Sequence, residues 1–124
     1  MITHTQIDHL NRRLRQVYAA DTAQPFDGKW SKGNPTKGHC AVVSMILTDL
    51  LPDSMIMTCR VKDGDQSIKH YYVDWAGFNI DLTFDQFSPG SVVYSRRQAD
   101  LGEYYFTDTF EKYLLLSERV DEVK

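Results

Sequence analysis

The pattern of hydrophobic and polar positions first predicts an amphipathic helix near the N-terminus. Its apolar positions recur at helical spacing and are Ile7, Leu10, Leu14, Val17 and Tyr18. Polar and basic side chains between positions 11 and 16 take the opposite face, which we interpret as a solvated surface. The helix is expected to run from about residue 5 to about residue 19. The pattern then breaks from Asp21 to Lys37, where prolines and glycines predict an ordered loop.

A second helix is predicted from Cys40 to Leu51. Its apolar residues cover nearly every face, and they are Ala41, Val42, Val43, Met45, Ile46, Leu47, Leu50 and Leu51. A short helix that is apolar all round is buried in the middle of a fold. Pro52 and Asp53 are expected to end this helix.

An alternating pattern predicts an antiparallel sheet after the second helix. Residues 55–61 alternate as in a strand, and an Asp-Gly turn leads into a second strand over residues 67–75. A third strand over residues 78–84 follows a turn at Ala76-Gly77, and residues 92–94 form a short final strand. Asp108 and Glu111 form a predicted capping box for a C-terminal helix. The order of elements predicts a single α+β domain over residues 1–124.

Composition and charge narrow the classes of function. The 124 residues are 42% hydrophobic and 25% charged, which is ordinary for a globular protein. The formal net charge of −3 leaves no basic stripe for phosphates, so nucleic acid is not expected as a partner. No apolar run approaches the roughly 20 residues that cross a bilayer, and the N-terminal segment does not have the pattern of a signal peptide. We expect a cytoplasmic protein with no membrane contact and two free thiols; a disulfide between them is the alternative.

Cys40 stands where the loop gives way to the buried helix, and this position suggests a nucleophile. Unsatisfied N–H groups and the helix dipole lower the pKa of a thiol at a helix N-terminus. A histidine that takes the thiol proton, and a carboxylate that orients the imidazole, would complete the activation. The alternative is that Cys40 fills space as a small buried hydrophobe. The second cysteine, Cys59, lies in mid-strand and is expected to pack in the core.

His70 is the best candidate for the base, and Asp81 for the carboxylate. In a hairpin that turns at Ala76-Gly77, His70 lies opposite Thr83 and diagonally from Asp81, within reach of a hydrogen bond. Both fall on the polar face of the sheet, whereas the buried helix should pack on the apolar face. A curled sheet or a β-bulge would let Cys40 reach His70. The alternatives are a core histidine held by a backbone group and an aspartate hydrogen-bonded to Thr83.

The stretches KWSKGNPTKGHCAVVSMILTDLL and KHYYVDWAGFNIDLTFDQF resemble the YunG-like family of small bacterial proteins. The similarity runs from Asp21 to Val120. The positions that carry it are Trp30, Asn34, Pro35, Gly38, Cys40, His70, Asp81, Thr83, Gln86 and Phe87. This chain departs from the family pattern at His39, where the family has glutamine, and at Val73, where it has asparagine.

The order Cys, His, Asp, with the cysteine opening a helix, is similar to that of papain-like and transglutaminase-like cysteine enzymes. The resemblance implies a papain-like core in which a buried central helix packs on a curled antiparallel sheet, with helices at both ends of the chain. In papain-like enzymes the oxyanion-hole side chain lies six residues before the nucleophile, a position held here by Asn34.

We therefore expect a cysteine hydrolase or acyl transferase acting on an amide or thioester-like carbonyl of a peptide, a protein side chain or a small acyl substrate. The expected catalytic residues are Cys40, His70 and Asp81, with Asn34 at the oxyanion and with His39, Trp30 and Tyr72 near the substrate. Trp30 also fits a buried anchor for its loop. No cofactor or metal is expected, because the cysteine and histidine spacings match no zinc pattern. The alternatives are a non-catalytic binding module and a toxin-like enzyme that modifies protein side chains.

Overall fold

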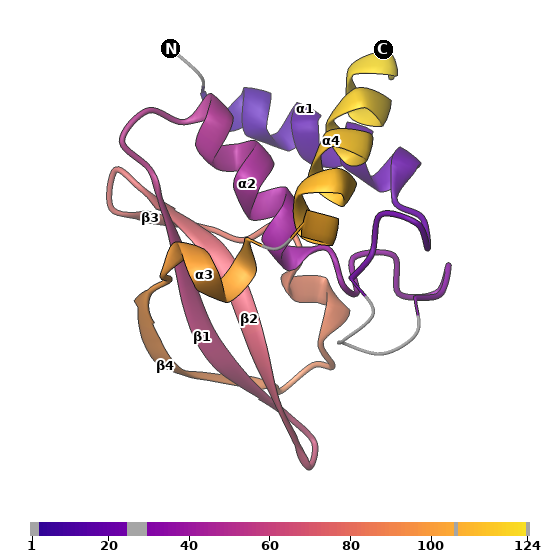
Figure 1. Cartoon of the computed structure of the whole chain (residues 1–124). Helices are drawn as coiled ribbons and strands as arrows, with labels where there is room; N and C mark the ends of the chain where they lie inside the picture. Colours follow the sequence, from indigo (N-terminus) through magenta and orange to yellow (C-terminus); the bar gives the residue numbers. More distant parts are fainter. Residues whose placement is uncertain (1–2, 25–29, 106, 124) are drawn as a thin grey trace.

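The computed structural model of the chain describes residues 3–24, 30–105 and 107–123. The elements in chain order are α1 (His4–Val17), α2 (Cys40–Leu50), β1 (Met55–Asp63), β2 (Gln66–Trp75), β3 (Phe78–Ile80), the 3-10 turn η2 (Phe84–Gln86), β4 (Val92–Gln98), α3 (Leu101–Tyr104) and α4 (Thr107–Glu122). The strands form one antiparallel sheet in the order β3-β2-β1-β4. The mixed α+β class predicted from the sequence is confirmed. Figure 1 shows α1, α2 and α4 grouped together on one side of the sheet.

The first helix has the amphipathic character that the sequence predicts. Thr3 caps it by accepting a hydrogen bond from the backbone of Gln6, whose side chain accepts one from the Thr3 N–H in return. Ile7, Leu10 and Leu14 are buried against the core. The helix ends at Val17, because the next residue, Tyr18, has an extended backbone.

The second helix lies at the centre of the fold. Every residue from Cys40 to Leu47 is buried, as expected for a helix that is apolar on all sides. One side of α2 packs on Val73 of β2, and another packs on Leu116 and Val120 of α4. None of the helices in the described ranges is long and apolar enough to cross a membrane.

The strand pairing fixes the position of the predicted site residues. β1 and β2 pair over their full length, with Cys59 opposite His70. β3 is shorter than predicted and pairs only with Val73, Asp74 and Trp75, so the predicted pairing of His70 with Thr83 is wrong. The chain leaves the sheet after β3 and continues into η2. Beside His70, the edge of β2 is therefore bordered by the segment 81–87 instead of by a strand.

The two faces of the sheet differ from the prediction in one respect. The face of β2 that carries Tyr71 and Val73 packs on α2, as expected. The opposite face, predicted to be polar, is closed at its centre by a second apolar cluster. Its buried members are Cys59, Val61, Tyr72 and Phe87, with Met57, Ile68, Phe84 and Val93 packed around them. This second cluster exists because the segment 81–87 folds back over the sheet.

Candidate functional site

Two of the predicted catalytic residues, His70 and Asp81, are in direct contact. The Nε2 atom of His70 lies 2.7 Å from Oδ2 of Asp81. The second carboxylate oxygen, Oδ1, accepts a hydrogen bond from the backbone N–H of Thr83 at 3.3 Å. The two contacts considered for Asp81, a hydrogen bond with histidine and a hydrogen bond with Thr83, are therefore both present. Asp81 is held from two sides and fixes the orientation of the imidazole.

The imidazole of His70 is fully enclosed. Its exposed fraction is 0%, and the rings of Phe84 and Phe87 meet it edge-on at centroid distances of 6.1 and 5.0 Å. Its Nδ1 atom is buried and has no hydrogen-bond partner among the described residues. Because a carboxylate can only accept, Nε2 carries the proton toward Asp81, and in the neutral ring Nδ1 is left with its lone pair. A buried polar atom without a partner is unusual in a core, and a catalytic role is one of its recognised explanations.

Cys40 lies on a different side of the sheet from His70. It is the first residue of α2, is 2% exposed, and packs in an apolar cluster with Met45, Ile56 and Tyr71. Successive side chains of a strand point to opposite faces, so the Tyr71 side chain faces α2 and the His70 side chain faces away from it. The two predicted catalytic residues can therefore meet only around the edge of β2.

The loop before Cys40 is tied to the segment that carries Asp81. The side-chain amide of Asn34 donates to the carbonyl of Gln86 at 3.0 Å, and the hydroxyl of Thr36 donates to Asp85 at 2.8 Å. Figure 1 shows η2 next to the start of α2. The start of α2 and the His70–Asp81 pair thus border the same segment. One N–H of the Asn34 amide is engaged with Gln86, which leaves the other for the predicted oxyanion contact.

His39 and Trp30 occupy structural positions. The His39 ring is 0% exposed, with Nε2 at 2.7 Å from the Thr22 hydroxyl and Nδ1 at 3.2 Å from the Lys37 carbonyl. Its burial lowers its pKa to about 4, so the ring is neutral at pH 7. The indole N–H of Trp30 donates to the Pro35 carbonyl at 3.0 Å, as expected for an anchor of the loop. These contacts give both side chains a role in holding the loop, and their place near the substrate stays a prediction.

A pocket of about 300 Å³ adjoins the His70–Asp81 pair. Its lining residues come from all four strands, from η2 and from the segment between β3 and η2, and they are Cys59, Tyr72, Asn79, Asp81, Phe84, Val93 and Arg96. Tyr72, one of the residues expected near the substrate, lines this pocket. Burial raises the pKa of the Cys59 thiol to about 11, so Cys59 is protonated and unreactive at pH 7. Arg96 was missed by sequence reasoning, because the strand that carries it is longer than the predicted residues 92–94.

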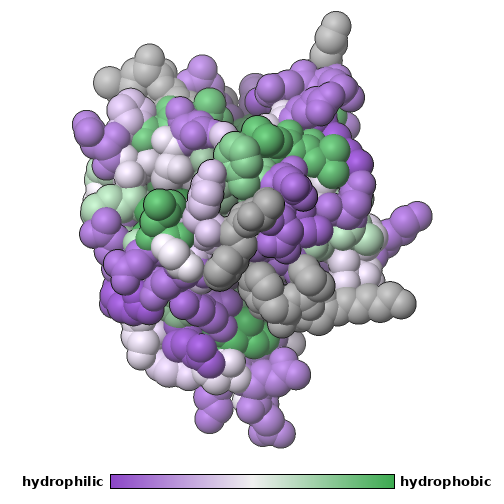
Figure 2. All heavy atoms as spheres, in the orientation of Figure 1, coloured by the Kyte–Doolittle hydropathy of each residue, from purple (hydrophilic) through white to green (hydrophobic). Residues whose placement is uncertain are grey.

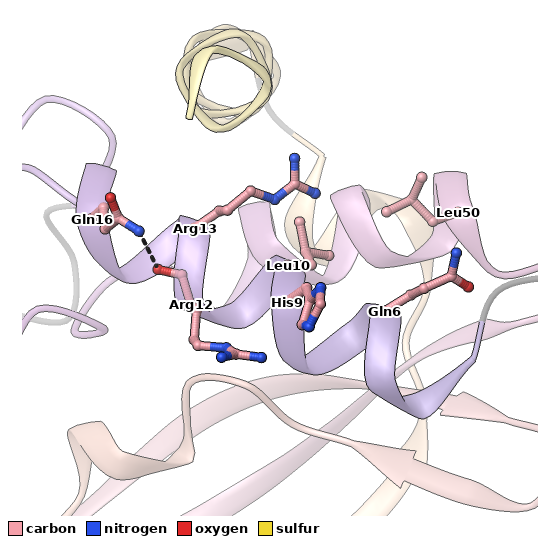
Figure 3. A pocket seen from close by; sticks show the side chains of 7 residues that line it. All are labelled: Gln6, His9, Leu10, Arg12, Arg13, Gln16 and Leu50. Atoms are coloured by element: carbon pink, nitrogen blue, oxygen red, sulfur yellow. Dashed lines mark hydrogen bonds between the residues drawn. The ribbon is translucent and has the colours of Figure 1, made fainter. Parts of the chain in front are cut away.

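A second, larger hollow of about 500 Å³ lies over α1 and contains none of the predicted site residues. Figure 3 shows the side chains of Arg12 and Arg13 around it, with Leu10 and Leu50 between the helices. The Gln16 amide donates to the Arg12 carbonyl at 3.4 Å at one end. Figure 2 shows apolar groups separated by hydrophilic side chains on the face turned to the viewer. We interpret the α1 hollow as part of a solvated basic surface, as the sequence predicts.

Metal ligands do not gather around the candidate site. Within residues 3–24, 30–105 and 107–123, no three side chains of His, Cys, Asp or Glu come close enough to hold a metal ion. Nε2 of His70 and the two carboxylate oxygens of Asp81 are engaged with each other and with Thr83. The described part of the site therefore contains a His–Asp pair, a buried lone pair and an adjoining pocket with one arginine.

Comparison with known proteins identifies a family. The family model described as "YunG protein" matches residues 6–124. The match includes the loop before α2, the His70–Asp81 pair and the C-terminal helix. Comparisons with curated proteins and with solved structures give no match. The sequence resemblance and the family match agree, and the chain belongs to the YunG family.

Proposed function

We propose that the protein is a cysteine hydrolase or acyl transferase with a papain-like or transglutaminase-like catalytic core. The observation that carries the proposal is the His70–Asp81 pair, with Nε2 bound at 2.7 Å and Nδ1 buried without a partner among the described residues. In a Cys-His-Asp triad, one imidazole nitrogen is held by the carboxylate and the other faces the thiol. The orientation of His70 leaves Nδ1 for that role.

The proposed reaction uses Cys40 as the nucleophile and His70 alternately as base and acid. Nδ1 of His70 removes the proton of the Cys40 thiol, and the sulfur attacks the carbonyl of an amide or thioester. The protonated imidazole then donates this proton to the leaving amine or thiol, which leaves an acyl group on Cys40. Water or an acceptor amine, deprotonated by His70, releases the acyl group and restores the thiol. The backbone N–H of Cys40 and the second N–H of Asn34 stabilise the oxyanion.

The proposal requires the Cys40 sulfur and Nδ1 of His70 to meet at the edge of β2. Two features support such a meeting. β3 does not continue past Ile80, so no strand covers this edge beside His70. The loop before Cys40 is hydrogen-bonded to the bordering segment through Asn34 and Thr36. A reducing compartment such as the cytoplasm, which we propose as its location, would keep the thiol reduced.

Alkylation of the native protein tests the proposal. Iodoacetamide is expected to label Cys40, with the midpoint of the rate–pH curve well below about 8.5, the value of a free thiol. Cys59 should stay unlabelled at neutral pH, because burial raises its pKa to about 11. His70→Ala should move the Cys40 midpoint back up. Mass spectrometry of the digested protein locates the label.

Asp81→Asn is the second variant, because it keeps the size of the side chain while removing its charge. It should also raise the midpoint of the rate–pH curve for alkylation of Cys40, because an amide stabilises the imidazolium less well than a carboxylate does. Cys40→Ala should abolish the labelling and Cys59→Ala should preserve it. Labelling of both cysteines only after unfolding would overturn the proposal, and so would a midpoint that neither His70→Ala nor Asp81→Asn changes.

A non-catalytic binding module is the second candidate. The observation that favours it is the burial of Cys40, which is 2% exposed and packs in an apolar cluster with Tyr71. In that case the fold and the pocket beside Asp81 would serve to hold a ligand, and neither cysteine would react in the native protein. The alkylation experiment separates the two functions directly.

A further inference from the structure

We infer that the pocket beside the His70–Asp81 pair binds a small molecule that carries a carboxylate and an apolar body, with Arg96 as the counter-charge. This inference names a substrate class for the proposed function and rests on that function for the reaction, but not for binding. It is carried by the pocket and by the contacts of Arg96. The test of this inference uses variants of Arg96 and Arg97, which take no part in the proposed reaction.

Arg96 is a positive charge held in place without a carboxylate partner. Its guanidinium carbon lies 5.1 Å from the centre of the Tyr72 ring, which fixes the group by a cation–π contact. Among the described residues, no Asp or Glu forms an ion pair with Arg96. The next residue, Arg97, is instead bound by Glu103, with an N–O distance of 2.5 Å. Arg96 is therefore the arginine of β4 that is available to an anionic ligand.

The acidic group that lines the pocket, Asp81, is held by its neighbours. It accepts from His70 with one oxygen and from Thr83 with the other, so both oxygens are directed at these partners, and among the described residues Asp81 forms no ion pair with Arg96. Asn79 is exposed at the rim and adds an amide that can donate to a carboxylate. Arginine binds carboxylates through two parallel N–H groups, a geometry that suits this arrangement.

The remaining lining gives the ligand its apolar part. Tyr72 and Phe84 provide aromatic surface, and Val93 provides an aliphatic wall. A volume of about 300 Å³ is at the lower end of the range for small-molecule sites. The chemistry of the lining thus fits an aryl or alkyl carboxylate about as large as one amino acid.

Titration of the ¹⁵N-labelled protein with phenylacetate tests the inference, with phenylacetamide as the uncharged analogue. Phenylacetate is expected to cause saturable shifts of backbone amides in β2, β4 and η2. Phenylacetamide should bind at least about tenfold more weakly, because a hydrogen bond between charged groups is lost. Arg96→Gln should weaken the binding of phenylacetate by a similar factor and leave the binding of phenylacetamide unchanged.

Arg97→Gln is the matched control, since Arg97 is the neighbouring arginine on β4 and does not line this pocket. It should leave the affinity for phenylacetate unchanged. Equal binding of the two probes, an equal loss in both arginine variants, or the absence of saturable shifts would each overturn the inference. Repeating the titration on Cys40→Ala keeps the two proposals apart, because binding should persist where alkylation is lost. Binding without Cys40 reactivity would refute only the proposed reaction.

Discussion

Replacing Gly38 with alanine is expected to lower the free energy of unfolding by about 3 kcal/mol. Gly38 has a φ of +80°, a conformation that costs an L-residue roughly 1–2 kcal/mol. A Cβ atom there would lie 2.8 Å from the backbone oxygen of Gln24 and 3.0 Å from its nitrogen. Those atoms cannot move freely, because the Gln24 N–H donates to the Gly38 carbonyl at 2.8 Å. Chemical denaturation measures the difference.

Gly77 and Gly90 provide matched controls for this variant. They have φ angles of +83° and +86°, close to that of Gly38, but a Cβ atom at either position would meet nothing within 4 Å. Gly77→Ala and Gly90→Ala should therefore lower the free energy of unfolding only by the cost of a positive φ angle, about 1–2 kcal/mol. An equal loss of stability in all three variants would contradict the explanation by close approach to Gln24. The result bears on the candidate site, because Gly38 places the loop two residues before Cys40.

His39 is expected to make the protein less stable in acid. Burial lowers the pKa of His39 from 6.5 to about 4 in the folded chain. Between these values the unfolded chain binds the proton and the folded chain does not, so protonation favours unfolding as the pH falls. The free energy of unfolding falls by about 3 kcal/mol between pH 6.5 and pH 4 because of His39. Above pH 6.5 the contribution of His39 to this free energy is constant.

His39→Gln isolates this contribution, because glutamine can hydrogen-bond to Thr22 and Lys37 without titrating. Denaturation curves of both proteins across the acid range measure it. The free energy of unfolding of the unaltered protein should fall more steeply with decreasing pH than that of His39→Gln, with the two curves parallel above neutrality. Curves that stay parallel down to about pH 4 would show that His39 is protonated as easily in the folded chain as in the unfolded one.

Local patterns were sufficient to predict most of the elements. The spacing of Leu10 and Leu14 identified α1, and the continuous apolar run after Cys40 identified a buried helix. The contact between His70 and Asp81 was also predicted. The register at the turn was right, with Trp75 opposite Phe78, but the third strand was predicted to continue beyond Ile80, where it ends. The reason for the error is local: Asp81 accepts a hydrogen bond from the backbone of Thr83, and this turn draws the chain out of the sheet.

Contacts between distant segments decide the features that could not be predicted. The segment 81–87 is held by Asn34 and Thr36, about 50 residues earlier in the chain, and no periodicity indicates such a bond. The same segment covers the face of the sheet that was expected to be polar. β4 extends to Gln98 because it pairs with β1 across an irregularity near Thr58, and this pairing brings Arg96 to the pocket. Strand pairing at this distance depends on the whole fold.

β4 forms the outer edge of the sheet, and its make-up bears on how separate copies of the chain behave toward one another. Six of its seven residues are exposed, and Ser95 interrupts it with a φ of +56°. Bent edges that carry charges are poor templates for a strand from another molecule. A second chain would have to pass this bend and approach Arg96 and Arg97 to extend the sheet. The fold thereby discourages growth into fibres at this edge of the sheet.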